Sequence, residues 1–77
     1  MLELYGTRSC PHTQEMREWL DWQRRDYVEY DVERDSVARR RLSELAKGQR
    51  SVPVLVENDT VVQVGWQGRS CMIDVLE

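Results

Sequence analysis

The sequence has few cysteines, no excess of positive charge and no long hydrophobic run, and each shortage excludes a class of protein. Two cysteines, Cys10 and Cys71, are too few for a disulfide scaffold. The longest apolar stretch, residues 52–56, is far shorter than the roughly 20 residues that a membrane span requires. The 11 basic residues are outnumbered by 14 acidic ones, so the net charge of −3 offers no general attraction to polyanions. We therefore expect neither a nucleic-acid partner nor a membrane partner.

The start of the chain and its overall composition favour a small cytoplasmic domain. Residues 1–5 show neither the basic segment nor the apolar segment of a signal peptide, so we expect the chain to remain in the reducing cytoplasm. The 77 residues show no repeat and no linker and predict one globular domain spanning residues 1–77, which we expect to be a monomer. Because a lasting structural disulfide is disfavoured in that compartment, a reactive or redox role for the cysteines must be weighed.

Hydrophobic patterning in the first part of the chain predicts alternating strands and helices. Alternation predicts a short strand over residues 2–5, and apolar residues at helical spacing predict a helix over residues 11–24. A strand is predicted over residues 27–32, and the next helix is expected to begin at a cap and end at Gly48. The expected core stripe of the first helix is Met16, Trp19, Leu20 and Gln23, the expected cap of the second is Asp35 or Ser36, and its stripe is Ala38, Leu42, Leu45 and Ala46.

The last third of the chain predicts a hairpin followed by a short helix. Segments rich in Val over residues 52–57 and 61–64 flank the turn residues Asn58 and Asp59. Ser70 is a suitable cap for a last helix, which would run through Met72, Ile73 and Leu76. The predicted order βαβαββα describes an α/β fold, a four-stranded mixed sheet with helices on both faces.

The residues with the clearest chemistry lie where the first strand hands over to the first helix. Cys10 directly precedes Pro11, so it is expected at the helix N-cap, where unpaired amides and the helix dipole can lower a thiol pKa from about 8.5 towards 4 to 7. Thr13 can turn its hydroxyl towards the sulfur, and Arg8 adds a positive charge in the preceding loop. Because the thiolate is the form that attacks disulfides, Cys10 is predicted to be a nucleophile, assisted by Thr13.

The segment Cys10-Pro11-His12-Thr13 resembles the Cys-Pro-Tyr-Cys motif, or its monothiol variants, of the glutaredoxins, which have the thioredoxin fold. The step Ser51-Val52-Pro53 is similar to the family's Thr-Val-Pro. The resemblance implies a cis proline beside the attacking sulfur, and backbone pairing between Val52 and the cysteine portion of glutathione or a protein substrate. We also expect substrate contacts from Arg8, Pro11, His12, Val52, Pro53 and Trp66.

The C-terminal segment from Gly65 to Ile73 is similar to the NrdH-type redoxins, which carry Trp-Ser-Gly-Phe-Arg there. This likeness implies thioredoxin reductase as the electron donor, whereas ordinary glutaredoxins imply glutathione, which would act here as a co-substrate. No further cofactor is expected. Thr13 stands where the family's second motif cysteine would be, so no disulfide can form within the motif.

For four features of the sequence, two alternative roles remain open. Cys71 is either the thiol that resolves a mixed disulfide on Cys10 or a small buried side chain. His12 either tunes the thiolate or is a solvated surface residue, and Trp66 is either a lid over the core or a contact for a redox partner. The basic run 39–41 is either a solvated face or a docking site for carboxylates. A metal site of Cys10, His12 and Cys71 is the weakest reading, because the spacing of Cys10 and His12 is too tight.

The sequence therefore predicts a glutaredoxin-like thiol–disulfide oxidoreductase, in which the Cys10 thiolate attacks a substrate disulfide. Either Cys71 or an external thiol such as glutathione would resolve the mixed disulfide. The substrate is expected to be a protein or a small molecule that contains a disulfide. Two alternatives belong to other classes: a module that binds or transfers an iron–sulfur cluster through Cys10 and glutathione, and a non-catalytic peptide-binding module.

Overall fold

The computed structural model describes residues 1–48 and 50–73, which form two helices and six strands. In chain order these elements are β1 (Leu2–Gly6), α1 (Pro11–Trp22), β2 (Val28–Asp31), α2 (Ser36–Leu45), β3 (Ser51–Val52), β4 (Val54–Glu57), β5 (Thr60–Val64) and β6 (Cys71–Met72).

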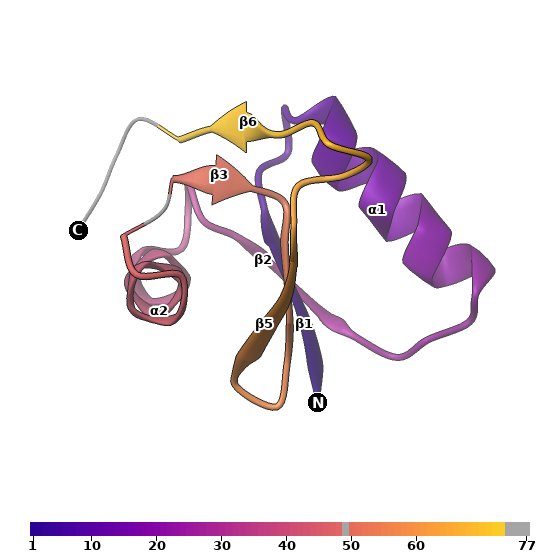
Figure 1. Cartoon of the computed structure of the whole chain (residues 1–77), viewed down its shortest axis with the longest axis horizontal. Coiled ribbons are helices and arrows are strands. Elements are labelled where there is room, and N and C mark those ends of the chain that lie inside the picture. The colour runs from indigo at the N-terminus through magenta and orange to yellow at the C-terminus, as the bar shows by residue number, and fades with distance from the viewer. Residues whose placement is uncertain (49, 74–77) are drawn as a thin grey trace.

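Four of the strands form one mixed sheet in the order β2-β1-β4-β5. Strands β1 and β2 run parallel, and β4 is antiparallel to both β1 and β5. The helices α1 and α2 lie on opposite sides of this sheet (Figure 1). The predicted α/β architecture, a four-stranded mixed sheet with helices on both faces, is confirmed.

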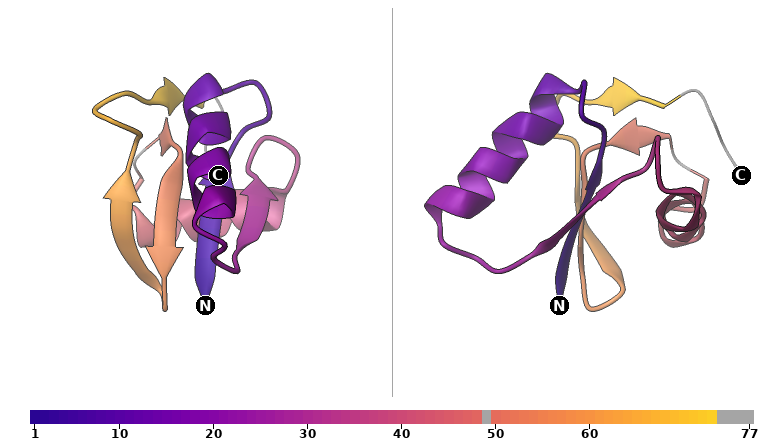
Figure 2. Two further views of the ribbon diagram at one scale, coloured as in Figure 1. Left: turned by 90° about the vertical axis from the view of Figure 1, so that its right-hand side faces the viewer. Right: turned by 180° about the vertical axis from the view of Figure 1, so that it is seen from behind.

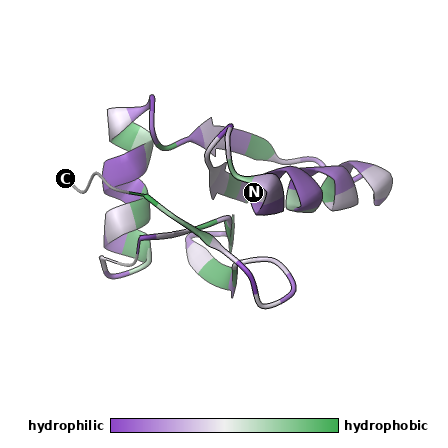
Figure 3. Cartoon of the chain, turned by 90° about the horizontal axis from the view of Figure 1, so that it is seen from above, coloured by the Kyte–Doolittle hydropathy of each residue, from purple (hydrophilic) through white to green (hydrophobic). Residues whose placement is uncertain are grey.

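Each face of the sheet carries its own hydrophobic cluster, because successive side chains of a strand point to opposite faces. Under α1 the buried residues are Leu2, Leu4, Met16, Leu20 and Leu55. Under α2 they are Tyr5, Cys10, Val32, Ala38, Leu42, Val52, Val54, Val56 and Ile73. Figure 3 shows hydrophilic and hydrophobic residues side by side on both helices, as expected for helices that cover a sheet with one face only.

The predicted cap of α2 agrees with the structure, whereas one residue of the predicted core stripe of α1 does not. The Asp35 side chain accepts hydrogen bonds from the amides of Val37 and Ala38, which confirms the predicted cap of α2. Helix α1 ends at Trp22, and Gln23, placed on its core stripe by the sequence, is exposed. The helix stops before Gln23 can reach the sheet, because Arg24 takes up a left-handed backbone conformation with a φ of 58°.

The hairpin is formed as predicted by β4 and β5, with Asn58 and Asp59 at the turn. Both residues have positive φ values, 51° and 65°, as a turn that matches the twist of its strands requires. The sequence did not predict that the residues before it would form a separate strand, β3.

The predicted last helix is wrong over the residues that the structure describes. Residues 71–72, expected just inside that helix after Ser70, form β6, which pairs antiparallel with β3 in a separate two-stranded sheet. Figure 2 shows β6 beside β3 at the end of the molecule where α1 begins. The pairing supplies backbone partners that a helix would otherwise provide. The remainder of the predicted helix, including Leu76, lies outside the described residues.

Neither α1 nor α2, the helices of the described segments, is long and apolar enough to cross a bilayer.

Candidate functional site

Cys10 lies at the N-cap of α1, as the sequence predicts. Its backbone is extended, with φ −84° and ψ 115°, and its amide donates to the carbonyl of Thr7 in the loop after β1, at 3.4 Å. Pro11 occupies the first helical position, where its missing N–H is not needed. The first turn of α1, residues 11–13, carries no acidic residue. The sulfur therefore sits at the positive end of the helix dipole with no carboxylate in that turn to oppose a negative charge.

Cys10 is joined to Cys71 by a disulfide bond. Their Cα atoms are 6.0 Å apart, within the range that a disulfide bridge requires. Cys10 is 2% exposed, whereas Cys71 is half-buried. Cys71 is thus a direct partner of Cys10 rather than a buried side chain without chemistry. It reaches Cys10 from a strand, whereas the sequence placed it near the start of a helix.

A tight turn after the hairpin brings Cys71 back to Cys10. Trp66 and Arg69 exchange two backbone hydrogen bonds, at 2.7 and 2.9 Å, around Gln67 and Gly68, which both have positive φ values. The amide of Gly65 donates to the carbonyl of Pro53 at 2.7 Å and fixes the start of the turn beside the sheet. Such a turn with glycine in its second position was a signal in the sequence, and it favoured a strand after it over the helix predicted from Ser70.

Val52 and Pro53 lie beside the disulfide, as the family resemblance implies. Both are buried, and the peptide bond between them is cis. Val52 lies opposite Cys71 in the pairing of β3 with β6, and Ser51 lies opposite Met72. The backbone edge that the resemblance assigns to a substrate is therefore occupied by the chain's own C-terminal segment.

Thr13 is fully buried, and its hydroxyl makes no hydrogen bond to the Cys10 sulfur. Its Oγ1 has no hydrogen-bond partner among the described residues, so the predicted bond to Cys10 is absent in this disulfide form. The side chain faces Gly6 instead, where an added Cβ would lie 2.6 Å from Oγ1. The close approach of α1 to β1 at Gly6 holds Thr13 in this inward position.

His12 and Arg8 flank the site on its solvent side. His12 is partly exposed, with its Nδ1 3.5 Å from Oε1 of Glu15. Arg8 is exposed and lines a cleft of about 510 Å³ at the ends of β1 and β2. The other residues of the cleft lining are Gly6, Thr7, Arg17, Glu29 and Asp31. Neither Arg8 nor His12 takes part in the disulfide, and both remain predicted substrate contacts.

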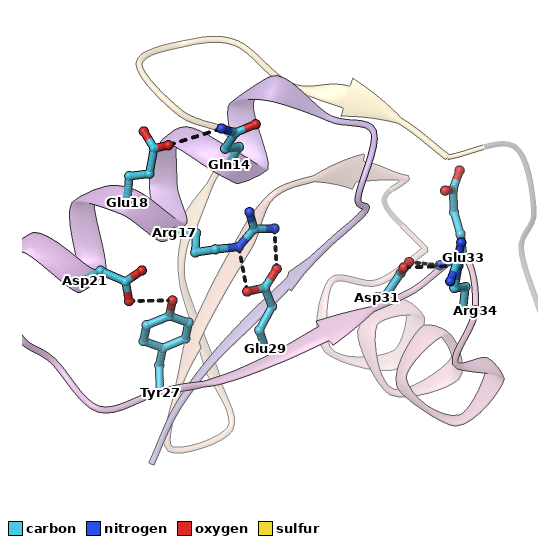
Figure 4. Close-up of polar contacts among 9 residues, drawn as sticks. All are labelled: Gln14, Arg17, Glu18, Asp21, Tyr27, Glu29, Asp31, Glu33 and Arg34. Carbon is cyan, nitrogen blue, oxygen red and sulfur yellow. Dashed lines mark hydrogen bonds and ion pairs between the residues drawn. The ribbon is translucent and has the colours of Figure 1, made fainter.

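Three charged side chains that line this cleft, Arg17, Glu29 and Asp31, have ion-pair partners. The guanidinium of Arg17 donates two hydrogen bonds to the carboxylate of Glu29, at 2.7 and 2.6 Å, as Figure 4 shows. The hydrogen bond to Glu29 raises the pKa of Arg17. Asp31 accepts from the amide of Glu33 and pairs with Arg34. The sequence did not single out Arg17 and Glu29, because they lie 12 residues apart on different elements and no local pattern joins them.

Trp66 packs against α1 rather than over the cysteines. Its ring centroid is 5.4 Å from that of Trp19, with a tilted arrangement, and both side chains adjoin the cluster under α1. This contact ties the turn before Cys71 to the outer part of α1. It supports the interpretation of Trp66 as a lid over the core. A contact between Trp66 and a redox partner stays a prediction.

Arg39 and Arg41 of the basic run have identified partners inside the molecule. The Arg41 guanidinium donates to the hydroxyl of Tyr5 and to Glu3, and it also pairs with Asp59. Arg39 donates to the carbonyl of Val32 at 2.9 Å. These contacts give Arg39 and Arg41 structural roles, and docking of carboxylates on this face stays untested.

Among residues 1–48 and 50–73, no three His, Cys, Asp or Glu side chains are grouped so that they could hold a metal ion.

Comparisons with known proteins agree with this fold. Residues 2–62 match the family model for Glutaredoxin. A probable glutaredoxin of Synechocystis sp. is 31% identical over 58 residues, which cover 75% of this chain and 53% of that protein. The chain thus spans about half the length of this curated relative.

Two solved structures show the same architecture. The crystal structure of the thioredoxin-like protein BC3987 is 32% identical with a TM-score of 0.73, covering 80% of this chain and 84% of that one. A glutaredoxin from Archaeoglobus fulgidus has a TM-score of 0.73 at 24% identity, covering 86% of this chain and 75% of that one. At that identity, the second likeness shows the fold alone.

Proposed function

The chain belongs to the glutaredoxin family, and from this premise we propose that it is a thiol–disulfide oxidoreductase in which Cys10 attacks and Cys71 resolves. The observation that carries the proposal is the disulfide between the N-cap of α1 and β6, with 6.0 Å between the Cα atoms. A motif with threonine in its fourth position offers no second thiol, and the distant Cys71 takes that place.

In the first step, the reduced Cys10 thiolate attacks one sulfur of a substrate disulfide. A new bond forms between Cys10 and that sulfur, the substrate's S–S bond breaks, and the other substrate sulfur leaves as a thiolate. The unpaired amides of the first turn of α1 favour the anionic form of Cys10. Thr13, through its buried hydroxyl, is proposed to donate a hydrogen bond to that thiolate once Cys71 has left.

In the second step, the thiolate of Cys71 attacks the Cys10 sulfur and forms the disulfide seen here. The second substrate sulfur leaves as a thiolate, so the substrate has gained two electrons and the protein has lost two. An external thiol donor must then reduce the protein disulfide. Glutathione and thioredoxin reductase remain the two proposed donors, and Arg8, His12 and Pro11 are proposed contacts for substrate or donor around the sulfur.

Intact mass after oxidation with glutathione disulfide tests the division of labour between the two cysteines. The wild-type protein is expected to lose two hydrogens, because Cys71 displaces glutathione from Cys10. A Cys71→Ser variant is expected to gain one glutathione and keep it. A Cys10→Ser variant is expected to show no catalysed disulfide reduction, and full reductase activity in that variant would contradict the proposal.

The iron–sulfur alternative requires a free Cys10 thiolate and glutathione. No contact of the described residues favours it, since Cys10 is engaged with Cys71. Anaerobic reconstitution with iron, sulfide and glutathione separates the two hypotheses. Visible absorbance of a bound cluster would support the alternative, and a colourless protein would count against it.

A further inference from the structure

Strand β6 pairs with the edge of β3 as a bound extended peptide would. Cys71 lies opposite Val52 and Met72 opposite Ser51, and the amide of Ile73 donates to the carbonyl of Arg50 at 3.0 Å. The segment 71–73 is therefore held along its whole length by backbone pairing, with its cysteine bonded to Cys10. A mixed disulfide between Cys10 and a substrate peptide would have these same features.

The side chains of this segment alternate between solvent and core, as in a paired strand. Met72 is 67% exposed, whereas Ile73 is 4% exposed. Ile73 is a member of the hydrophobic cluster that contains Val52 from β3 and Ala38 and Leu42 from α2. A pocket for an aliphatic side chain therefore lies two residues after the position of the cysteine that is bonded to Cys10.

We propose that β6 is an internal occupant of the substrate strand position on β3, and that the pocket filled by Ile73 selects substrates with an aliphatic residue two positions after their reactive cysteine. The proposal rests on the disulfide exchange proposed above. In the oxidised form the edge of β3 is closed to substrate. A thiol reductant, which supplies two electrons and two protons to the cysteines, breaks the bond to Cys10 and leaves β6 held by backbone pairing, by Ile73 and by the hydrogen bond that Ser51 Oγ donates to Met72 Sδ at 3.6 Å. Substrate and β6 then compete for one edge, and Cys71 returns to it when it displaces the substrate.

Two peptides of equal composition test the pocket. In Cys-Ser-Ile the aliphatic residue lies two positions after the cysteine, and in Cys-Ile-Ser it lies one position after it. Each peptide carries thionitrobenzoate in a disulfide on its cysteine, and attack by Cys10 on the peptide sulfur releases the coloured thionitrobenzoate anion. With the reduced Cys71→Ser variant, which cannot close its own disulfide, we expect Cys-Ser-Ile to react about tenfold faster, because its aliphatic side chain becomes buried. Equal rates for the two peptides would overturn the proposed pocket.

Loss of the internal anchor tests the competition. In the Cys71→Ser background, Ile73→Ser is expected to speed the reaction with Cys-Ser-Ile, because β6 no longer competes for β3. Val62→Ser is the matched control, since it replaces an aliphatic side chain by serine on β5, outside the pair of β3 and β6, where Val62 is 53% exposed, and it is expected to leave that rate unchanged. An unchanged rate in the Ile73→Ser variant would overturn the competition.

Failure of the proposed function has a different signature. The comparison is with free N-acetylcysteine as the attacking thiol. If the Cys71→Ser variant releases thionitrobenzoate from both peptides no faster than N-acetylcysteine does under the same conditions, Cys10 is not an activated nucleophile, and both proposals are overturned. Fast and equal release from the two peptides would overturn the pocket alone.

Discussion

Thr13 on α1 faces Gly6 on β1, and its hydroxyl oxygen is buried without a hydrogen-bond partner among the described residues. Gly6 provides the space that this approach requires, because any Cβ there would overlap the Thr13 side chain. A buried hydroxyl with no partner lowers stability, so its retention needs a cause outside the oxidised structure. Donation to the Cys10 thiolate in the reduced form is the cause that we propose.

The Thr13→Val variant is expected to separate stability from reactivity. Valine keeps the shape and removes the unsatisfied hydroxyl, so the oxidised protein should gain about 1 kcal/mol in free energy of unfolding. The reduced variant, combined with Cys71→Ser, should react several-fold more slowly with a thionitrobenzoate disulfide. Urea unfolding and absorbance kinetics measure the two effects. A more stable variant with an unaltered rate would remove Thr13 from the mechanism.

The ionisation of Cys10 can be compared with that of Cys71 in matched single-cysteine variants. In Cys71→Ser, we expect the rate of alkylation by iodoacetamide to reach half its maximum at a pH below about 7.5, because the N-terminus of α1 favours the thiolate. In Cys10→Ser, the remaining Cys71 thiol is carried by a strand and not by the N-cap residue of α1, so its midpoint is expected at a higher pH. Identical midpoints in the two variants would show that the helix has no such effect.

Tyr5 predicts a loss of stability in alkaline solution. Burial raises the pKa of Tyr5 to about 12, from an ordinary value of 10.0. Because the folded state holds the phenol proton more tightly than the unfolded state, this contribution is intact below pH 10 and is lost as the pH rises through about 12. The free energy of unfolding should therefore fall over this interval.

The Tyr5→Phe variant is the control for this alkaline effect. It removes the hydroxyl that donates to Glu3 and accepts from Arg41, so it should lower the free energy of unfolding at neutral pH by about 1 kcal/mol. Its alkaline decline should be shallower, with a part left because burial also raises the pKa of Tyr27 to about 12. Denaturant unfolding at a series of pH values measures both, and an equally steep decline would contradict the assignment to Tyr5.

Tryptophan fluorescence is expected to report the redox state of the cysteines. Reduction frees Cys71, and the turn that holds Trp66 against Trp19 is then no longer tied to Cys10. The emission of the wild-type protein should shift to longer wavelength on reduction. Trp66→Phe should abolish the shift, whereas Trp22→Phe should preserve it, because Trp22 is 80% exposed and stands apart from this contact. A shift that survives in Trp66→Phe would contradict this account.

Local patterns predicted most of this fold, and the failures lie where long-range contacts decide the structure. The cap at Asp35, the turn at Asn58 and the N-cap at Cys10 each depend on residues close in sequence, and all three are confirmed. The segment at Cys71 is too short for its own periodicity to choose between helix and strand. Its partner, β3, lies about twenty residues away along the chain, and only that pairing makes it a strand.

The candidate site shows the same division between local and long-range information. The position of Cys10 followed from Pro11 and the helix after it, whereas the inward orientation of Thr13 depends on Gly6 from β1. The bond between Cys10 and Cys71 spans 61 positions, so the sequence left the role of Cys71 open between two readings. The pairing of Arg17 with Glu29 likewise appears only when α1 is placed over β2.

The turn at Gln67 and Gly68 has a consequence for how this protein tolerates changes in length. In an extended segment, side chains switch sides at every step, so the count of residues between Arg69 and Cys71 determines which of them meets Cys10. One additional residue there would bring Ser70 towards the sulfur and turn the cysteine outward. Two additional residues would restore the parity but displace the thiol along β3. The proposed partnership of Cys10 with Cys71 therefore depends on the number of residues in this short turn as much as on the two sulfur atoms.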